Sequence, residues 1–330
     1  MLRRILVGAA LAAPALLAAT RAGAQTRLRW AHVYETNEPY HAQALWAAEQ
    51  IRERTGGRWA VEVFPASALG NEPTINQGLA LGTVDMIYTG VAFAGSTFKP
   101  VSIGTAPYMF RDYDHFSAYR NSDLLRELMA GYTRQTNHNA LALTYYGERH
   151  VTANKPIARP EDMRGMKLRV PQAPLFLMFT RSVGANATPI AFAEVYLALQ
   201  QGTVDGQENP LPTIQAKKFH EVQSHVSLTG HITESLLTIV SGGTWRRLND
   251  ADKNTFQQVL REASDRASAE IRRQELELPA WFESQGKTVV RPDRAAFRAA
   301  ALPLHNDAQA GAGWPREQYD RLQAIASRQG

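Results

Sequence analysis

Arg169 is the residue whose type and position most clearly suit it to bind an anion. It lies in the run MKLRVP at 166–171, whose alternation predicts a strand over 167–170. Pro171 cannot continue the hydrogen-bonded pairing, so Arg169 is expected at the carboxyl end of this strand, where open α/β sheets bind ligands. A guanidinium there can hold a carboxylate through two parallel charge-assisted hydrogen bonds. A surface arginine paired with an acid explains the run equally well, so the pattern alone leaves both interpretations open.

Three further residues are expected near the same edge of the sheet. Arg149 follows a predicted strand over 140–146 and a glycine, and Asn209 lies just past a short predicted strand. Both side chains can donate hydrogen bonds to oxygen atoms, and their position at strand ends favours a cleft shared with Arg169. Phe192 can cover the apolar face of a ligand, although a core phenylalanine is the more usual outcome.

The sequence carries no recognisable catalytic signature. The motifs G-x-S-x-G, H-E-x-x-H, G-x-x-x-x-G-K-[ST] and G-x-G-x-x-G are all absent. The chain has no cysteine, which excludes zinc–thiolate sites and cysteine nucleophiles, and its nine histidines are scattered. We therefore expect a binding protein that is not an enzyme and that has no cofactor and no bound metal. The rival from another class is a hydrolase that uses Glu72 or Glu208 as a general base.

Alternating strand-like and helix-like segments must position these residues, and they predict an α/β fold. Strands are expected at 28–33, 60–64, 140–146, 167–170, 236–240 and 287–290, and helices at 40–54, 114–134, 175–182 and from Asp250 towards Glu277. Apolar residues at three- and four-residue steps give the last helix one stripe, and we expect Pro279 to bend or end it. A helix of that length extends about 40 Å, which is enough to join two lobes.

An internal repeat also predicts two lobes of similar construction. The tetrad Gly-Thr-Val-Asp occurs at 82–85 and again 120 residues later at 202–205. Each copy follows an amphipathic segment, and its glycine stands where the end of a helix favours a residue at positive φ. Strand-like residues follow both copies. Because four residues can match by chance, the matched context carries the prediction.

The first 24 residues predict a cleaved secretory signal peptide. Arg3 and Arg4 precede an apolar run at 5–19, and an Ala-Gly-Ala cleavage pattern ends at Ala24. We therefore expect a periplasmic protein that begins at Gln25, and the sequence leaves open whether the Sec or the twin-arginine route exports it. Loss of the three leader arginines lowers the formal net charge from +5 to +2, so no nucleic-acid partner is expected.

The segment 147–231 closely resembles the solute-binding proteins of TRAP (tripartite ATP-independent periplasmic) transporters, the DctP type. The matching stretches are 154–157, 162–171, 194–200, 204–210, 218–219 and 221–223, and weaker matches cover the rest of the mature chain. The resemblance implies a two-lobed periplasmic binding protein with a ligand cleft between the lobes, crossing strands and a long helix that spans both. We expect lobe I at 25–146 plus about 235–274, and lobe II at 147–234 plus about 275–330.

The resemblance also implies roles for individual residues. Arg169 forms the principal salt bridge to a ligand carboxylate, Arg149 and Asn209 support it, and Phe192 forms a wall of the site. First-lobe contacts are expected from the segments 32–35, 71–72 and 88–90, and the candidates there are His32, Glu35, Asn71, Glu72 and Tyr88.

The function implied is capture of a small organic acid by closure of the lobes, followed by delivery to the small and large membrane subunits of a TRAP transporter. We expect a monomer and no ATPase. A sugar acid such as a uronate is favoured, and a C4-dicarboxylate or another carboxylate is the alternative. Relatives that bind sialic acid carry an acidic residue where this chain has Gly90, so sialic acid is not the expected ligand.

Overall fold

The structure of the protein is a computed structural model that describes residues 25–327. The expected signal peptide lies outside the described residues. The strands are β1 (Thr26–Ala31), β2 (Trp59–Phe64), β3 (Met86–Gly90), β4 (Asn139–Ala153), β5 (Lys167–Val170), β6 (Asn186–Pro189), β7 (Gly206–Pro210), β8 (His225–Val240) and β9 (Thr288–Val290). The helices are α1 (Pro39–Arg54), α2 (Glu72–Leu81), α3 (Val91–Ala94), α4 (Tyr113–Arg120), α5 (Asp123–Thr136), α6 (Leu177–Val183), α7 (Val195–Gln200), α8 (Leu211–Ala216), α9 (Gly242–Arg247), α10 (Asp250–Ser284), α11 (Arg294–Ala301) and α12 (Arg316–Ala324). Short 3-10 helices connect several of them.

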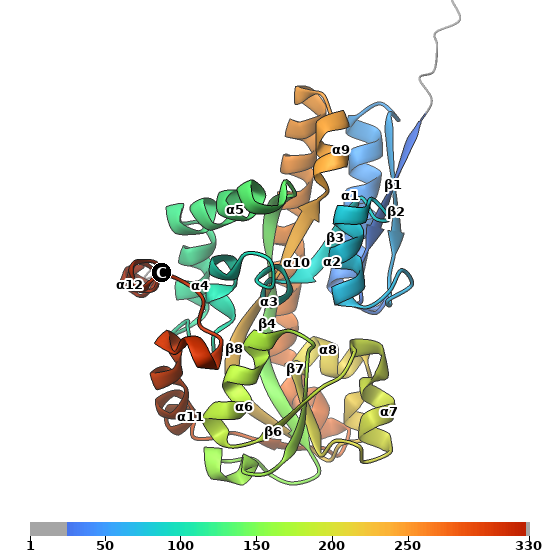
Figure 1. Cartoon of the computed structure of the whole chain (residues 1–330). Coiled ribbons are helices and arrows are strands. Elements are labelled where there is room, and N and C mark those ends of the chain that lie inside the picture. Colours follow the sequence, from blue (N-terminus) through green and yellow to red (C-terminus); the bar gives the residue numbers. More distant parts are fainter. Residues whose placement is uncertain (1–24, 328–330) are drawn as a thin grey trace, which may run out of the picture.

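All strands of the described residues join one sheet in the order β2-β1-β3-β8-β4-β7-β5-β6, and β9 pairs with β8. β4 and β8, with 15 and 16 residues, pair with each other in antiparallel orientation. β8 pairs with β3 at one end, and β4 pairs with β7 at the other. The two long strands therefore run from an upper group of elements, which includes β1 to β3, to a lower group, which includes β5 to β7 (Figure 1). These are the expected crossing strands.

Gly147 lets β4 continue where the sequence predicted that it ends. Its φ is 116°, and the pairing with β8 shifts register between Tyr145 and Gly147, which is a bulge in the strand. A Cβ atom at this position would come within 2.8 Å of the Pro210 side chain. Arg149 thus lies inside a strand and not after one, and Asn209 likewise lies within β7. A glycine that forms a bulge was interpreted as the end of a strand.

The Gly-Thr-Val-Asp repeat marks the same local structure in both halves. The glycines that follow α2 and α7 have φ values of 70° and 68°. The Asp85 backbone N–H donates to the Arg29 carbonyl, and its Oδ2 accepts from the Arg29 N–H, both at 2.9 Å. Asp205 makes the same two hydrogen bonds with Lys167, both at 2.8 Å. Each copy aligns a strand with its parallel neighbour, as two similarly built lobes require.

The apolar stripe correctly predicted the long helix α10, but not its end. The helix has 35 residues, which extend about 52 Å. It packs along α1 and β4 and also contacts α8 and β9, so it joins the two groups of elements (Figure 1). It continues past Pro279 to Ser284, so of the two effects expected of the proline, a bend or an end, the end was wrong. Proline removes one backbone hydrogen bond, whereas Leu278 and Phe282 are both buried and hold the last turns in place.

The segment 114–134, expected as one helix, forms two. α4 ends at Arg120, and Ser122 caps α5 by accepting a hydrogen bond from the Leu125 backbone N–H at 3.2 Å. At the carboxyl terminus, α12 packs against α5, and Arg321 forms an ion pair with Glu127 at 2.7 Å. The end of the chain therefore contacts a part of the molecule that the expected division assigns to lobe I.

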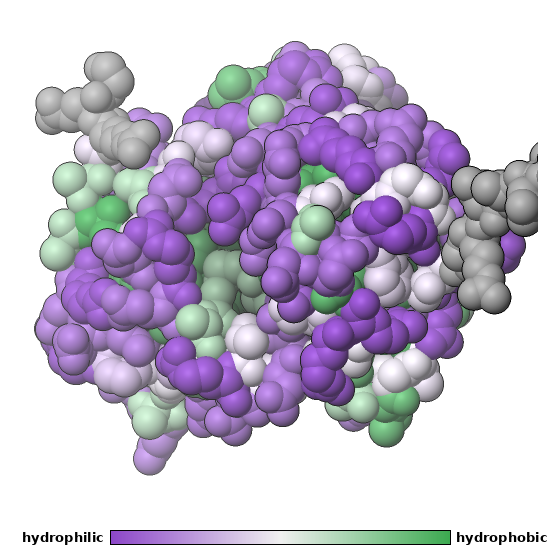
Figure 2. Space-filling view, turned by 90° about the horizontal axis from the view of Figure 1, so that it is seen from above, coloured by the Kyte–Doolittle hydropathy of each residue, from purple (hydrophilic) through white to green (hydrophobic). Residues whose placement is uncertain are grey.

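Polar side chains cover most of the face seen from above, which also has a hollow with a more apolar floor (Figure 2). The apolar residues gather instead in a core that follows the sheet from one group of elements to the other. Within residues 25–327, no helix combines the length and the hydrophobicity needed to cross a membrane.

Candidate ligand-binding site

A small cavity lies where the strands β4, β7 and β5 meet residues from the first half of the chain. β7 lies between β4 and β5 in the sheet, which brings Arg149, Asn209 and Arg169 together as predicted. The residues that line the cavity are Val33, Tyr34, Glu72, Gly90, Phe93, Tyr146, Arg149, Arg169, Pro171, Phe176, Phe192, Asn209, Glu234 and Leu236. Both groups of elements therefore contribute to its wall.

Arg169 lines this cavity, and part of its guanidinium has no hydrogen-bond partner among the described residues. Arg169 is only 2% exposed and lies on β5, beside Gln207 of β7. Nε and Nη2 both donate to the Ile190 carbonyl, at 3.0 and 2.7 Å, whereas Nη1 has no hydrogen-bond partner in the described part of the chain. Burial lowers the pKa of Arg169 to about 10, since the charges of nearby acids compensate for it only in part. The Nη1–Nη2 edge of the guanidinium can therefore accept a carboxylate.

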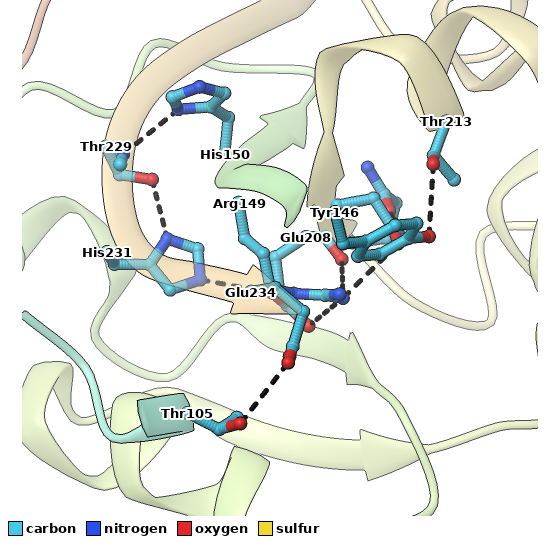
Figure 3. A network of polar contacts seen from close by, with 12 residues as sticks. Thr105, Tyr146, Arg149, His150, Glu208, Thr213, Thr229, His231 and Glu234 are labelled. Atoms are coloured by element: carbon cyan, nitrogen blue, oxygen red, sulfur yellow. Dashed lines mark hydrogen bonds and ion pairs between the residues drawn. The ribbon is translucent and has the colours of Figure 1, made fainter. Parts of the chain in front are cut away.

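Arg149, in contrast, already holds a carboxylate of the chain itself. It forms a buried ion pair with Glu208 through Nε, and its Nη2 donates to the other carboxylate oxygen at 2.8 Å (Figure 3). His231 Nε2 lies 3.1 Å from the same carboxylate. Burial alone would raise the pKa of Glu208, but the charge of Arg149 and the hydrogen bonds from His231 and Arg149 lower it. Burial would likewise lower the pKa of Arg149, and the Glu208 charge raises it instead.

Asn209 and Phe192 complete the second-half side of the cavity. Asn209 Oδ1 accepts from Arg149 Nη2 at 3.3 Å, and its Nδ2 donates to Gln207 at 2.6 Å, so neighbouring side chains fix the amide. The Phe192 ring lies 6.0 Å from Arg169 Cζ and 6.4 Å from the Tyr34 ring of the first half. The phenylalanine thus lines the cavity and also bridges the two groups of elements.

Two acids of the chain line the cavity without a direct ion pair. Glu72 Oε1 accepts from the Gly90 backbone N–H at 3.0 Å and lies 3.5 Å from the Tyr34 hydroxyl. Glu234 Oε1 accepts from the Thr105 hydroxyl at 3.2 Å, and Oε2 has no partner among the described residues. Burial raises the pKa of each carboxyl to about 7. The cavity therefore combines one free guanidinium with two weakly compensated acids.

Four of the predicted site residues do not line the cavity. Asn71 caps α2, with Oδ1 accepting from the Thr74 N–H at 3.0 Å, and Tyr88 is buried against Trp30. His32 Nε2 lies 3.2 Å from His41, and burial lowers the pKa of His32 to about 3. Glu35 pairs with Lys217 at 2.7 Å between the two groups of elements. These side chains lie around or behind the cavity wall.

The sequence prediction missed several residues that line the cavity. Glu234 left a signal, because it is a lone acid in the apolar segment at 232–240. Tyr146 and Phe176 left none, since aromatic residues next to predicted strands and helices are more often core. Their neighbours in space come from distant parts of the chain, and Arg149 Cζ lies 5.0 Å from the Phe176 ring centre.

The hydrolase alternative loses Glu208, one of its two candidate general bases, whereas the other, Glu72, has a pKa raised to about 7. Glu208 is engaged by Arg149 and His231, and the lowering of its pKa makes it a weak base. Within residues 25–327, no three His, Asp or Glu side chains are grouped so that they could hold a metal ion.

Comparison with known proteins identifies the family of the chain. Residues 30–311 match the family described as bacterial extracellular solute-binding protein, family 7. The sialic acid-binding periplasmic protein SiaP of Vibrio cholerae is 35% identical over 300 residues, which cover 91% of this chain and 94% of SiaP.

Two solved structures of TRAP periplasmic solute-binding proteins share the fold. The protein of Polaromonas sp. JS666, bound to D-erythronate, superposes with a TM-score of 0.87 and 30% identity over 92% of this chain and 100% of that one. The protein of Roseobacter denitrificans, with bound L-galactonate, gives 0.84 and 31% over 91% of this chain and 98% of that one. The predicted two-lobed α/β fold is confirmed.

Proposed function

The chain belongs to bacterial extracellular solute-binding protein family 7, and from this premise we propose that it captures a sugar acid for a TRAP transporter. It would deliver the acid to the small and large membrane subunits of that transporter. The observation that carries the proposal is the free Nη1 of the buried Arg169, in a cavity lined by both groups of elements. A buried guanidinium without an anion is unfavourable, so a ligand carboxylate stabilises the protein when it binds.

The remaining features agree with this role. The Arg149–Glu208 pair and Asn209 form a fixed support beside Arg169, and Phe192 offers an apolar face. Contacts such as Glu35–Lys217 and Tyr34–Phe192 connect the two sides, as closure around a ligand requires. We propose that the mature protein acts in the periplasm as a monomer, after cleavage near Ala24, and that its lobes divide as the sequence predicts.

Sugar acids are favoured because two similar proteins have been solved with polyhydroxy acids, D-erythronate and L-galactonate. Sialic acid, which the SiaP protein binds by its name, is less favoured. The position where the resemblance implies an acid is Gly90, and its backbone N–H already engages Glu72. A C4-dicarboxylate is the alternative within the same family.

The carboxylate requirement can be tested with acids and their neutral lactones. D-Erythronate, L-galactonate and D-glucuronate are added separately to ligand-free protein, and thermal unfolding is recorded. At about 100 times Kd a true ligand stabilises by about 2.7 kcal/mol, so the Tm should rise by several degrees, whereas the matching lactone should leave it unchanged. A lactone as effective as its acid would contradict an anion site. Hydrolysis of the lactone at the rate seen without protein distinguishes binding from catalysis, because the acids themselves carry no hydrolysable bond.

A further inference from the structure

Glu234 is a buried acid that has hydrogen-bond partners among the described residues at only one of its two carboxylate oxygens. It is 1% exposed, on β8. The Thr105 hydroxyl donates to Oε1 at 3.2 Å (Figure 3). The Ser235 backbone N–H donates to the same oxygen at 3.1 Å, and together they fix the carboxyl group. Oε2 has no partner among residues 25–327. Because a buried oxygen without a hydrogen bond is unfavourable, this atom is suited to accept a hydrogen bond from a molecule in the cavity.

The charges of the cavity wall indicate which chemical group of a ligand can donate this hydrogen bond to Glu234 Oε2. Arg149 and Arg169 are the two cations that line it. Arg149 is neutralised by Glu208, and in the proposed function Arg169 is neutralised by the ligand carboxylate. A second carboxylate of a ligand would then meet no free cation, and it would face Glu72 and Glu234. A hydroxyl group would instead find an acceptor at Glu234 Oε2.

We propose that Glu234 is a specificity-determining residue, which accepts a hydrogen bond from a ligand hydroxyl and makes the cavity select hydroxylated monocarboxylates over dicarboxylates. This inference rests on the proposed function, because it assumes a ligand carboxylate at Arg169. It goes beyond that function because it assigns a role to the second polar group of the ligand. It also decides against the dicarboxylate alternative.

The test uses pairs of ligands that differ only at one end. D-Erythronate is compared with meso-tartrate, and L-galactonate with galactarate, so that in each pair a terminal CH₂OH becomes a carboxylate. Affinities of the ligand-free mature protein are measured by calorimetry at pH 8, above the pKa of about 7 of Glu72 and Glu234, and at one ionic strength. The wild type should bind the monoacid of the better pair at least about tenfold more tightly than its diacid, since repulsion from buried acids is weakly screened.

Glu234→Gln should then reduce this preference at least about tenfold. The amide keeps an oxygen for Thr105 and Ser235, removes the negative charge and offers an N–H to a second carboxylate. Glu221→Gln, an acid with an exposed side chain outside the cavity, is the matched control and should leave the preference unchanged.

The outcomes separate the two proposals. If none of the four acids binds, the sugar-acid function fails. If an acid binds and needs Arg169, but monoacid and diacid bind the wild type within threefold, the function stands and the role of Glu234 is overturned. An unchanged preference in folded Glu234→Gln also overturns it. If that variant does not fold, the wild-type ratio still decides the selection of monocarboxylates.

Discussion

Arg149 and Arg169 are two buried arginines that line one cavity, and they differ in their partners. Each is 2% exposed, and the two lie on β4 and β5, with β7 between them. Arg149 donates from Nε and Nη2 to the carboxylate of Glu208, which is its counterion. Arg169 has only the Ile190 carbonyl, a neutral acceptor, at its Nε side. Their pKa values move accordingly, since that of Arg149 is raised and that of Arg169 is lowered to about 10.

The two arginines show how one cavity wall can combine a fixed ion pair with a guanidinium that has unused hydrogen-bond donors. A paired arginine is fixed by charge and hydrogen bonds, and it holds Asn209 in the cavity wall. An unpaired arginine costs stability while the cavity holds no anion, and it regains that free energy when an anion binds. Stability should therefore depend on Arg149, and affinity should depend on Arg169.

The largest expected effect is a difference in the free energy of unfolding between variants of the two arginines. Arg149→Met leaves Glu208 as a buried charge without its main counterion, so the free energy of unfolding should fall by about 3–5 kcal/mol. Arg169→Met removes a buried charge that forms no ion pair with any residue of 25–327, and it should change stability by less than about 1 kcal/mol or increase it. Denaturant unfolding of ligand-free proteins measures both. Equal losses would show that the two arginines play the same part.

The next effect concerns affinity. Arg169→Lys should weaken binding of the best acid at least about tenfold, because a lysine ammonium cannot reproduce the two parallel hydrogen bonds of the Nη1–Nη2 edge. Its thermal stability without ligand should stay close to that of the wild type. Calorimetric titration gives the affinity, and Arg181→Lys, on the exposed side of α6, serves as control. An unchanged Kd would remove Arg169 from the site.

The last effect concerns pH, since the pKa values of two acids near Arg149 are shifted in opposite directions. The pKa of Glu234 is raised to about 7, so its contribution is lost as pH rises towards that value, and Glu234→Gln should gain about 1–3 kcal/mol on the wild type between pH 5 and pH 8. The pKa of Glu208 is lowered, so its contribution is present above about pH 4.5 and is lost below it. Glu208→Gln should therefore be least harmful in acid. Thermal unfolding of both variants against pH measures these trends, and parallel trends would contradict them.

Local patterns in the sequence were enough for much of the fold. The Gly-Thr-Val-Asp repeat predicted equivalent turns because a helix end at positive φ favours glycine wherever it occurs. The stripe of α10 predicted a helix that joins both lobes. More than half of each crossing strand was missed, however. The bulge at Gly147 and the partly polar run from His225 to Thr233 depend on pairing with strands far away in the sequence.

The candidate site divides in the same way. Residue type and strand position indicated Arg169, Arg149 and Asn209 but left a surface role for Arg169 open, and the resemblance assigned Phe192 and Glu72 to the site; all five line the cavity. The sequence did not show that Arg149 finds a counterion 59 residues away in Glu208 while Arg169 finds only a carbonyl group. An arginine has the same donors wherever it stands, and only the order of β4, β7 and β5 decides which donors are already used. The sequence thus predicted an anion site with Arg169 as its principal cation, and the tertiary structure shows why Arg149 has a counterion among the described residues and Arg169 has a carbonyl group instead.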